Sequence, residues 1–242
     1  MSQIGGVKMN RFLIYLFIFV CVLSIIILKG YITEAHRPLN TEGSNTRENP
    51  IFINDHKISW AAYNTLEGPN DVDYYKFEVE KGDGIYASIV IPVIDGFENF
   101  NPEFALIGPD LTSDYDGLNQ NEIKDRLEIK SGEGVIVKKY NNQRTGIFFE
   151  PFTQTSYWEK QEATIQAPFK GTYYLAVFSN QNEEGKYVLS IGRREKWGIN
   201  DLIRMPKIWW DVRMFTENKK STYVITGLFA VAVIYILVKI GK

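Results

Sequence analysis

Two long apolar runs lie near the two ends of the chain. The first covers residues 12–28 without a charged side chain, and the second covers residues 223–238. Each run is about as long as an α-helix needs to cross a hydrocarbon core of ~30 Å. The pattern predicts transmembrane helices over 12–29 and 222–240, with a cleaved signal peptide as the alternative for the first and a buried core helix as the alternative for the second.

Between these runs, short stretches rich in β-branched and aromatic residues alternate with turns that contain Gly, Asp, Asn or Pro. Such stretches predict strands, and no convincing helical period lies between them. Short strands without intervening helices favour a mainly β fold, an antiparallel jelly-roll β-sandwich. The predicted strands cover 58–66, 73–79, 84–91, 103–107, 134–139, 146–150, 163–167, 172–179 and 186–191.

The segment between the first apolar run and the strands is polar. Residues 36–50 contain Pro, Asn and Gly and show no apolar period. Such a composition is typical of a flexible connection. We therefore expect residues 30–50 to be a linker and the β-sandwich domain to cover 51–193.

Apolar residues recur at near-helical spacing after the strands, while charged residues fall on another side. This pattern predicts an amphipathic helix over 197–217, capped by Asn200 or Asp201 and restarted at Pro206. A Trp-rich helix with basic residues beside an apolar run is typical of the membrane headgroup layer, and packing against the sandwich is the alternative. The side chains that we expect at the membrane interface are Trp197, Trp209, Trp210 and Arg213.

Charge separates the middle of the chain from its ends. All 29 Asp and Glu lie between residues 30 and 221 with 22 of the 27 Lys and Arg, so this region carries a net charge of −7. An acidic domain argues against nucleic-acid binding, which needs a basic surface. Because the short ends are basic, we expect a two-pass protein of the cell membrane. Both termini, with a tail over 1–11, would be cytoplasmic and the middle domain extracytoplasmic.

Five segments of the middle region form a further pattern: Asn70–Val79 (NDVDYYKFEV), Lys81–Asp83 (KGD), Ala167–Pro168 (AP), Gly171–Val177 (GTYYLAV) and Gly185–Ile191 (GKYVLSI). Together they resemble the two halves of a bacterial pre-peptidase C-terminal (PPC-like) domain. The resemblance covers roughly residues 58–192 and implies a small jelly-roll β-sandwich, secreted or surface-exposed and usually a non-catalytic appendage. A long insertion over 110–161 separates the halves, and no protease domain accompanies them in this sequence.

Residue types that carry catalysis or bind metals are sparse. His36 and His56 are the only histidines, and no nucleophile motif accompanies them, so we expect no enzymatic activity. Zinc, haem and iron–sulfur sites need clusters of Cys and His that the sequence lacks. Calcium needs only oxygen ligands on turns, so the sequence permits a structural Ca²⁺, with solvated turns as the alternative. Its candidate ligands are Glu67, Asn70, Asp71, Asp73, Asp114 and Asp116.

A cluster of aromatic residues lies within residues 147–160. Flat rings beside polar side chains suit a sugar-stacking platform or a protein-binding patch, whereas in an all-β protein they also suit the core. The candidate surface residues are Phe149, Phe152, Tyr157 and Trp158. We expect a non-catalytic, membrane-anchored accessory or assembly subunit that binds a membrane or envelope protein. The alternative is a domain that binds carbohydrate or a surface polymer.

Overall fold

The computed structural model describes residues 36–41, 46–68, 70–141 and 146–240, without the side chains of 236, 239 and 240. The tail over 1–11 and the transmembrane helix predicted over 12–29 lie outside these described residues. The predicted linker over 30–50 is described only at residues 36–41 and 46–50, and the other predictions fall within the described residues.

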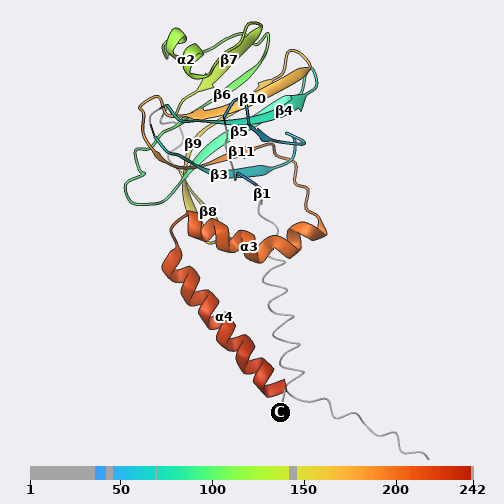
Figure 1. Cartoon of the computed structure of the whole chain (residues 1–242), viewed down its shortest axis with the longest axis vertical. Helices are drawn as coiled ribbons and strands as arrows, with labels where there is room; N and C mark the ends of the chain where they lie inside the picture. Colours follow the sequence, from blue (N-terminus) through green and yellow to red (C-terminus); the bar gives the residue numbers. More distant parts are fainter. Residues whose placement is uncertain (1–35, 42–45, 69, 142–145, 241–242) are drawn as a thin grey trace, which may run out of the picture. The chain divides into compact units, whose positions relative to one another are not determined.

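Two β-sheets pack face to face and form the sandwich (Figure 1). Sheet A has the order β1 (Arg37–Leu39), β3 (Trp60–Leu66), β11 (Gly185–Ile191), β5 (Gly84–Pro92), β9 (Thr155–Gln166) and β8 (Ile147–Glu150). Sheet B has the order β2 (Ile51–Phe52), β4 (Val72–Val79), β10 (Gly171–Phe178), β6 (Glu103–Pro109) and β7 (Glu133–Lys138). Neighbouring strands are antiparallel, except that the short strands β1 and β2 run parallel to β3 and β4. The mainly β sandwich is confirmed, with two parallel pairs that the sequence did not indicate.

The main core lies between the sheets, because each central strand turns alternate apolar side chains inward. Tyr173, Leu175 and Val177 of β10 face Tyr187 and Leu189 of β11 in this core. The opposite face of β10 is also apolar and joins a second buried cluster. A strand that is apolar on both faces is expected to be central, and β10 lies between β4 and β6.

A buried chain of hydrogen bonds crosses from sheet A to sheet B. The hydroxyl of Tyr187 donates to the Oδ2 atom of Asp73 over 2.6 Å and lies 2.8 Å from the hydroxyl of Tyr75. All three side chains are buried, and burial raises the pKa of the Tyr187 hydroxyl well above its usual value. The network satisfies polar groups that would otherwise be costly at this depth.

The predicted insertion over 110–161 is not a separate unit. It contains β7, β8 and the first half of β9, which pair within both sheets. It also contains a short helix, α2 (Gln120–Arg126), whose N-terminus is capped by the side chain of Asn119. Ile123 buries this helix against the second apolar cluster. The expectation that no helix interrupts the strands was therefore wrong.

The predicted linker over 30–50 is also part of the fold where it is described. Residues of β1 pair with β3, and Nδ1 of His36 forms a short hydrogen bond with the hydroxyl of Ser59. Further along, Arg47 is buried, binds both carboxylate oxygens of Glu133 at 2.6 Å and lies over the ring of Tyr174 at 4.7 Å. Tertiary partners thus order a segment whose composition alone indicated a flexible chain.

Two helices follow the strands: α3 (Ile199–Phe215) and α4 (Lys219–Ile240). The backbone N–H of Gly198 donates to Oδ2 of Asp201 at 2.8 Å and fixes the start of α3. Helix α3 continues through Pro206 rather than restarting there, although proline in a helix interior removes one backbone hydrogen bond and costs about 3 kcal/mol. For α4, the helix is confirmed over the predicted segment. Within the described residues, however, no helix meets the length and apolarity needed to cross a membrane.

Candidate interaction surface

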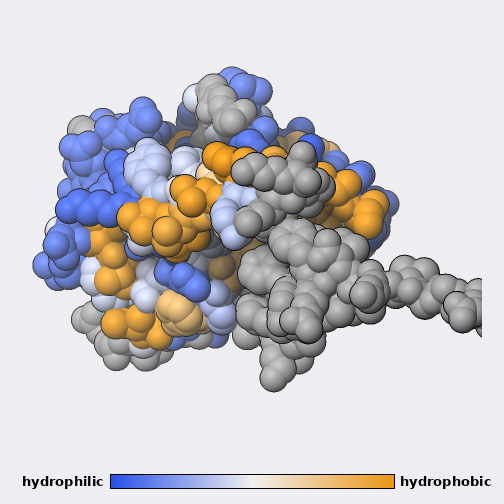
Figure 2. Space-filling model, turned by 90° about the horizontal axis from the view of Figure 1, so that it is seen from below, coloured by the Kyte–Doolittle hydropathy of each residue, from blue (hydrophilic) through white to orange (hydrophobic). Residues whose placement is uncertain are grey.

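Exposed apolar side chains gather on α3, on α4 and on the edge strand β8, and Figure 2 shows apolar patches from below. Such patches mark surfaces that other molecules cover. Helix α4 exposes apolar side chains along its described length rather than on one stripe. Its exposed large residues are Tyr223, Val224, Ile225, Leu228, Phe229, Val231, Val233, Ile234, Tyr235, Leu237 and Val238.

The C-terminal half of α3 packs against the outer face of sheet A. The ring of Phe215 meets the ring of Tyr63 edge-on at 5.6 Å, and Val212 is buried. Phe215 joins a small apolar cluster formed by Ala61, Tyr157 and Val188 of sheet A. This contact corresponds to the alternative prediction, a helix packed on the sandwich. At the other end of α3, apolar side chains remain exposed: Ile199, Leu202 and Ile203.

Arg213 is buried between the end of α3, the start of α4 and sheet A. The prediction that it lies at a membrane interface was therefore wrong. The side chain is only 3% exposed. Its Nη1 atom donates to the carbonyl of Thr153 at 2.6 Å, in the turn between β8 and β9. Its Nε and Nη2 atoms donate to Thr222 at 2.9 Å and Ser221 at 2.5 Å, at the start of α4. One guanidinium therefore joins both helices to sheet A. No local sequence pattern indicates this role, because the partners of Arg213 are ordinary Ser and Thr residues.

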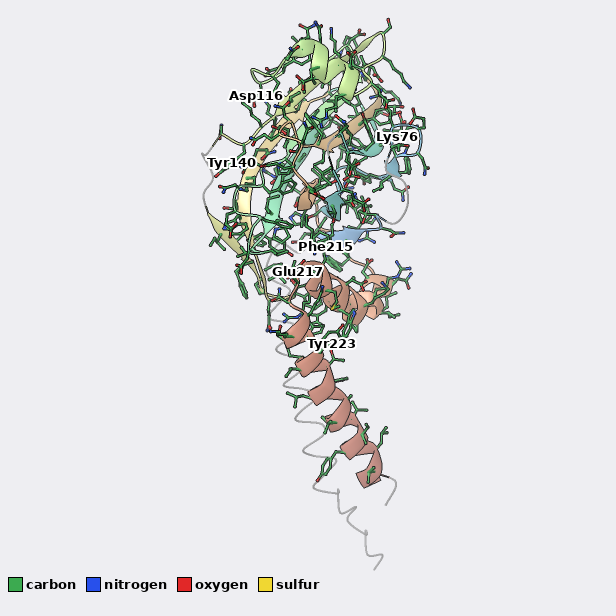
Figure 3. All side chains as sticks on the ribbon, turned by 60° about the vertical axis from the view of Figure 1, so that its left-hand side comes forward. Lys76, Asp116, Tyr140, Phe215, Glu217 and Tyr223 are labelled. Atoms are coloured by element: carbon green, nitrogen blue, oxygen red, sulfur yellow. The ribbon has the colours of Figure 1, made fainter. Side chains whose placement is uncertain are left out.

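Two ion pairs fasten α3 to the sandwich at its two ends. Lys186 of β11 donates to the carbonyl of Phe215 at 3.0 Å and to Glu217 at 2.8 Å, and this pairing lowers the pKa of Glu217. Arg37 of β1 binds Asp201 at 2.9 Å and lies over a Trp ring of β3. Figure 3 labels Phe215, Glu217 and Tyr223 along the corner between the helices. The helix is thus anchored at both ends rather than free to pivot.

The three tryptophans predicted at the interface are half-buried. The guanidinium of Arg213 lies 4.9 Å from the centre of the Trp209 ring. Trp210 meets Tyr223 of α4 edge-on at 5.6 Å, while Trp197 precedes α3. A place in the headgroup layer stays a prediction for these rings.

The aromatic segment over 147–160 divides between surface and core. On β8, Ile147, Phe148 and Phe149 are 63%, 41% and 54% exposed. Tyr157 of β9 is buried instead, accepts a hydrogen bond from Thr155 at 3.0 Å, and has its pKa raised to about 12 by burial. The predicted surface position of Tyr157 was therefore wrong.

The two other predicted aromatics lie between these extremes. Phe152 is half-buried in the turn after β8, and Trp158 is half-buried against the main core. Strand alternation explains the division, because successive side chains of β9 point to opposite faces of sheet A. The exposed part of the segment is the edge strand β8.

The candidate calcium ligands do not converge into one acidic cluster. The Asp71 carboxylate accepts the N–H of Glu67 at 2.8 Å, and Asp73 binds Tyr187 in the core. Asp114 and Asp116 accept backbone N–H groups near β7. Among the described residues, no three His, Cys, Asp or Glu side chains are grouped to hold a metal ion. Asn70 is exposed in the loop before β4, and calcium binding stays a prediction.

His56 lies in the core rather than in a catalytic arrangement. Its ring stacks on Phe77 at 5.4 Å, and its Nε2 atom is 3.8 Å from the carboxylate of Asp83. Burial lowers the pKa of His56, although Asp83 opposes that shift. Asp83 is itself bound by Lys57 at 2.8 Å. The ring therefore acts as a packed side chain of the sandwich.

The class of protein that these features define is a β-sandwich with a braced, apolar helical corner. No protein-family model matches the chain, and a comparison with characterised proteins finds no relative. Distant similarity to solved structures covers part of the chain. A periplasmic inhibitor of g-type lysozyme from Salmonella Typhimurium is 16% identical, over 58% of this chain and 96% of that one, with a TM-score of 0.31.

Two further structures are comparably distant. The corresponding inhibitor from Aeromonas hydrophila is 9% identical over 65% of this chain and 98% of its own, with a TM-score of 0.32. The pre-peptidase C-terminal domain of a Bacillus anthracis collagenase is 14% identical over 65% of this chain and 96% of its own, with a TM-score of 0.28. Scores at this level assign neither a family nor a function to the chain.

Proposed function

We propose that this chain is a non-catalytic, membrane-associated module that binds a membrane or envelope protein as an accessory subunit on the extracytoplasmic side. The observation that carries the proposal is α4, whose apolar side chains are exposed while its first turn is fastened to the sandwich. Apolar surface on this scale is costly in water and is stabilised by lipid or by other apolar helices.

The braced corner supports a positioning role for the helices. Because Arg213 and Lys186 connect α3 and α4 to sheet A, the sandwich would be held at a defined orientation to whatever covers α4. A module held in this way presents the same surface to every neighbour in the membrane plane, which favours lateral protein contacts. The basic residues Lys8, Arg11, Lys239 and Lys242 beside the two apolar runs support placing the middle region on the extracytoplasmic side.

Alkaline carbonate extraction of membranes from cells that express the full chain tests the association. We expect the chain to stay in the membrane pellet, and release into the supernatant would contradict the proposal. Co-purification from mild detergent then tests the accessory role, through a stoichiometric membrane protein that remains bound. The sugar-binding alternative is not favoured by the surface, because Tyr157 is buried and Trp158 packs against the core.

A further inference from the structure

Three of the four sheet edges are protected against pairing with another strand. The outer edge of sheet A at β1 is only three residues long and contains Pro38. The outer edge of sheet B at β2 is two residues long. At β7, the backbone of Asp114 exchanges hydrogen bonds of 2.8 Å with Val135 and Val137 and covers the edge. Short strands, proline and covering loops are the usual means of preventing edge-to-edge association.

The fourth edge strand, β8, is also short, with four residues that end at Glu150, but among the described residues it has neither a proline nor a covering loop. Its sequence Ile147-Phe148-Phe149 lacks proline and charge, and all three side chains are exposed. The N–H of Glu159 donates to the carbonyl of Gly146 at 3.0 Å, which fixes the hydrogen-bonding phase of the β8–β9 ladder. Along an antiparallel strand, the backbone N–H and C=O groups of successive residues point alternately toward the neighbouring strand and away from it. The backbone groups of Phe148 therefore face β9, whereas those of Ile147 and Phe149 face outward.

We propose that β8 pairs with β8 of a second copy of this chain, antiparallel and across a two-fold axis. In the favoured register, Ile147 lies opposite Phe149 of the partner subunit, and Phe148 lies opposite Phe148 of the partner subunit. This register places outward-facing donors and acceptors against each other in two hydrogen-bonded pairs. Within Ile147–Phe149 it opposes only apolar side chains. Glu150 lies opposite Gly146 of the partner subunit, and its carboxylate accepts the N–H groups of its own turn at 2.9 and 2.6 Å.

The position of the helices agrees with this symmetry. The two-fold axis of an antiparallel strand pair runs perpendicular to the sheet, so both copies turn the same face of sheet A to the same side. That face carries α3, and α4 starts at the end of α3 beside Arg213. Both α4 helices would therefore begin on one side of the joined sheet, as two copies associated with one membrane require.

This inference rests on the proposed membrane association. A four-residue strand buries far less than the roughly 1,200 Å² of a stable soluble interface. Confinement of both copies to one membrane raises their effective concentration and favours a contact that would be weak in solution. We therefore expect pairing in membranes and dissociation when detergent dilutes the chains.

Cysteine cross-linking in membranes tests the register. In a Cys21→Ser background, Phe148→Cys places two cysteines in a non-hydrogen-bonded pair, whose Cα separation of about 4.5 Å permits a disulfide. Phe169→Cys is the matched control, because Phe169 is 46% exposed and lies outside β8. With copper phenanthroline, we expect a disulfide-linked dimer from Phe148→Cys at a yield at least tenfold above the control. A yield equal to the control, or a cross-link to a different protein, would overturn the proposal.

A second pair of variants separates pairing from folding. Phe149→Pro removes an outward N–H that β9 does not use, and Phe149→Val keeps that N–H. We expect Phe149→Pro, but not Phe149→Val, to abolish the cross-link, with both variants unfolding near the parent temperature. If any variant fails to fold, the oligomeric state of the unmodified chain is measured from its mass in lipid nanodiscs. A monomer at a high ratio of chains to nanodiscs would overturn the proposal. Chains that remain in the carbonate pellet without pairing would contradict only the dimer, whereas chains released by carbonate would contradict the proposed function.

Discussion

Replacing Arg213 by methionine should loosen the corner between the helices while leaving the sandwich folded. Methionine keeps much of the apolar length of the side chain but removes all three hydrogen bonds from its guanidinium. The hydroxyls of Ser221 and Thr222 also donate to the carbonyl of Asn218, at 3.1 and 2.7 Å, so they retain a partner. The Thr153 carbonyl loses its contact with a charged donor, the most costly of the three losses.

The free-energy cost of Arg213→Met follows from the hydrogen-bond partners that the guanidinium loses. Hydrogen bonds to charged groups contribute roughly 1.5–3 kcal/mol each, and the retained hydroxyl bonds reduce the sum to about 3 kcal/mol. If the corner opens locally, that free energy corresponds to about a hundredfold faster hydrogen–deuterium exchange of its amides. We expect this increase in peptides covering 151–155 and 216–224 of the full chain in mild detergent, with no change in β10.

The control is Arg204→Met on the same helix, since Arg204 is exposed. Its exchange should match that of the parent chain in every peptide. Unchanged protection at 216–224 in Arg213→Met would refute the bracing role of Arg213. Loss of protection throughout β10 would show instead that the corner and the sandwich unfold together.

Three further predictions concern the sandwich, each measured on the full chain in mild detergent. Tyr187→Phe removes the donor to buried Asp73 and should cost about 2–3 kcal/mol in thermal or denaturant unfolding; a loss below ~1 kcal/mol would contradict a charge-assisted bond. His56 has a lowered pKa, so its stabilising contribution is present above pH 6.5 and is lost as the pH falls. His56→Phe should therefore reduce the drop in unfolding temperature between pH 7 and pH 5, and an unchanged drop would assign the effect to other groups. Gly134→Ala would bring Cβ to 1.8 Å from a backbone carbonyl and should prevent stable folding, whereas Gly68→Ala, with open space around it, should not.

The strands were predictable because their apolar residues serve one buried surface. The nine predicted strands correspond to β3 through β11, and the two-sheet class followed from them. The sequence pattern did not predict β1 and β2. These strands have only three and two residues and are defined by their pairing with β3 and β4. The predicted strand 163–167 covers only the last third of β9 (Thr155–Gln166), because the residues before it are largely polar or aromatic and lack regular alternation.

The candidate site was predictable only in part. Exposure of Phe149 on a short strand agrees with the expected surface patch, whereas Tyr157 is buried because α3 covers that face of sheet A. Arg213 and Asp73 were assigned by charge and neighbours in sequence to lipid and calcium. Their partners lie far along the chain, at Thr153 and Tyr187, and such tertiary contacts leave no local pattern.

The order of strands in the two sheets has a consequence for biosynthesis. Sheet A becomes continuous only when β11 pairs with both β3 and β5. Sheet B becomes continuous only when β10 pairs with both β4 and β6. Both central strands come from residues 171–191, so they are synthesised after β3, β4, β5 and β6, the strands with which they pair. Until they emerge, the earlier strands have unpaired edges and uncovered apolar faces, which are prone to aggregation. The sandwich therefore has to be kept from premature association until residues 171–191 have been synthesised, and a truncation before Gly171 should aggregate rather than fold as a smaller domain.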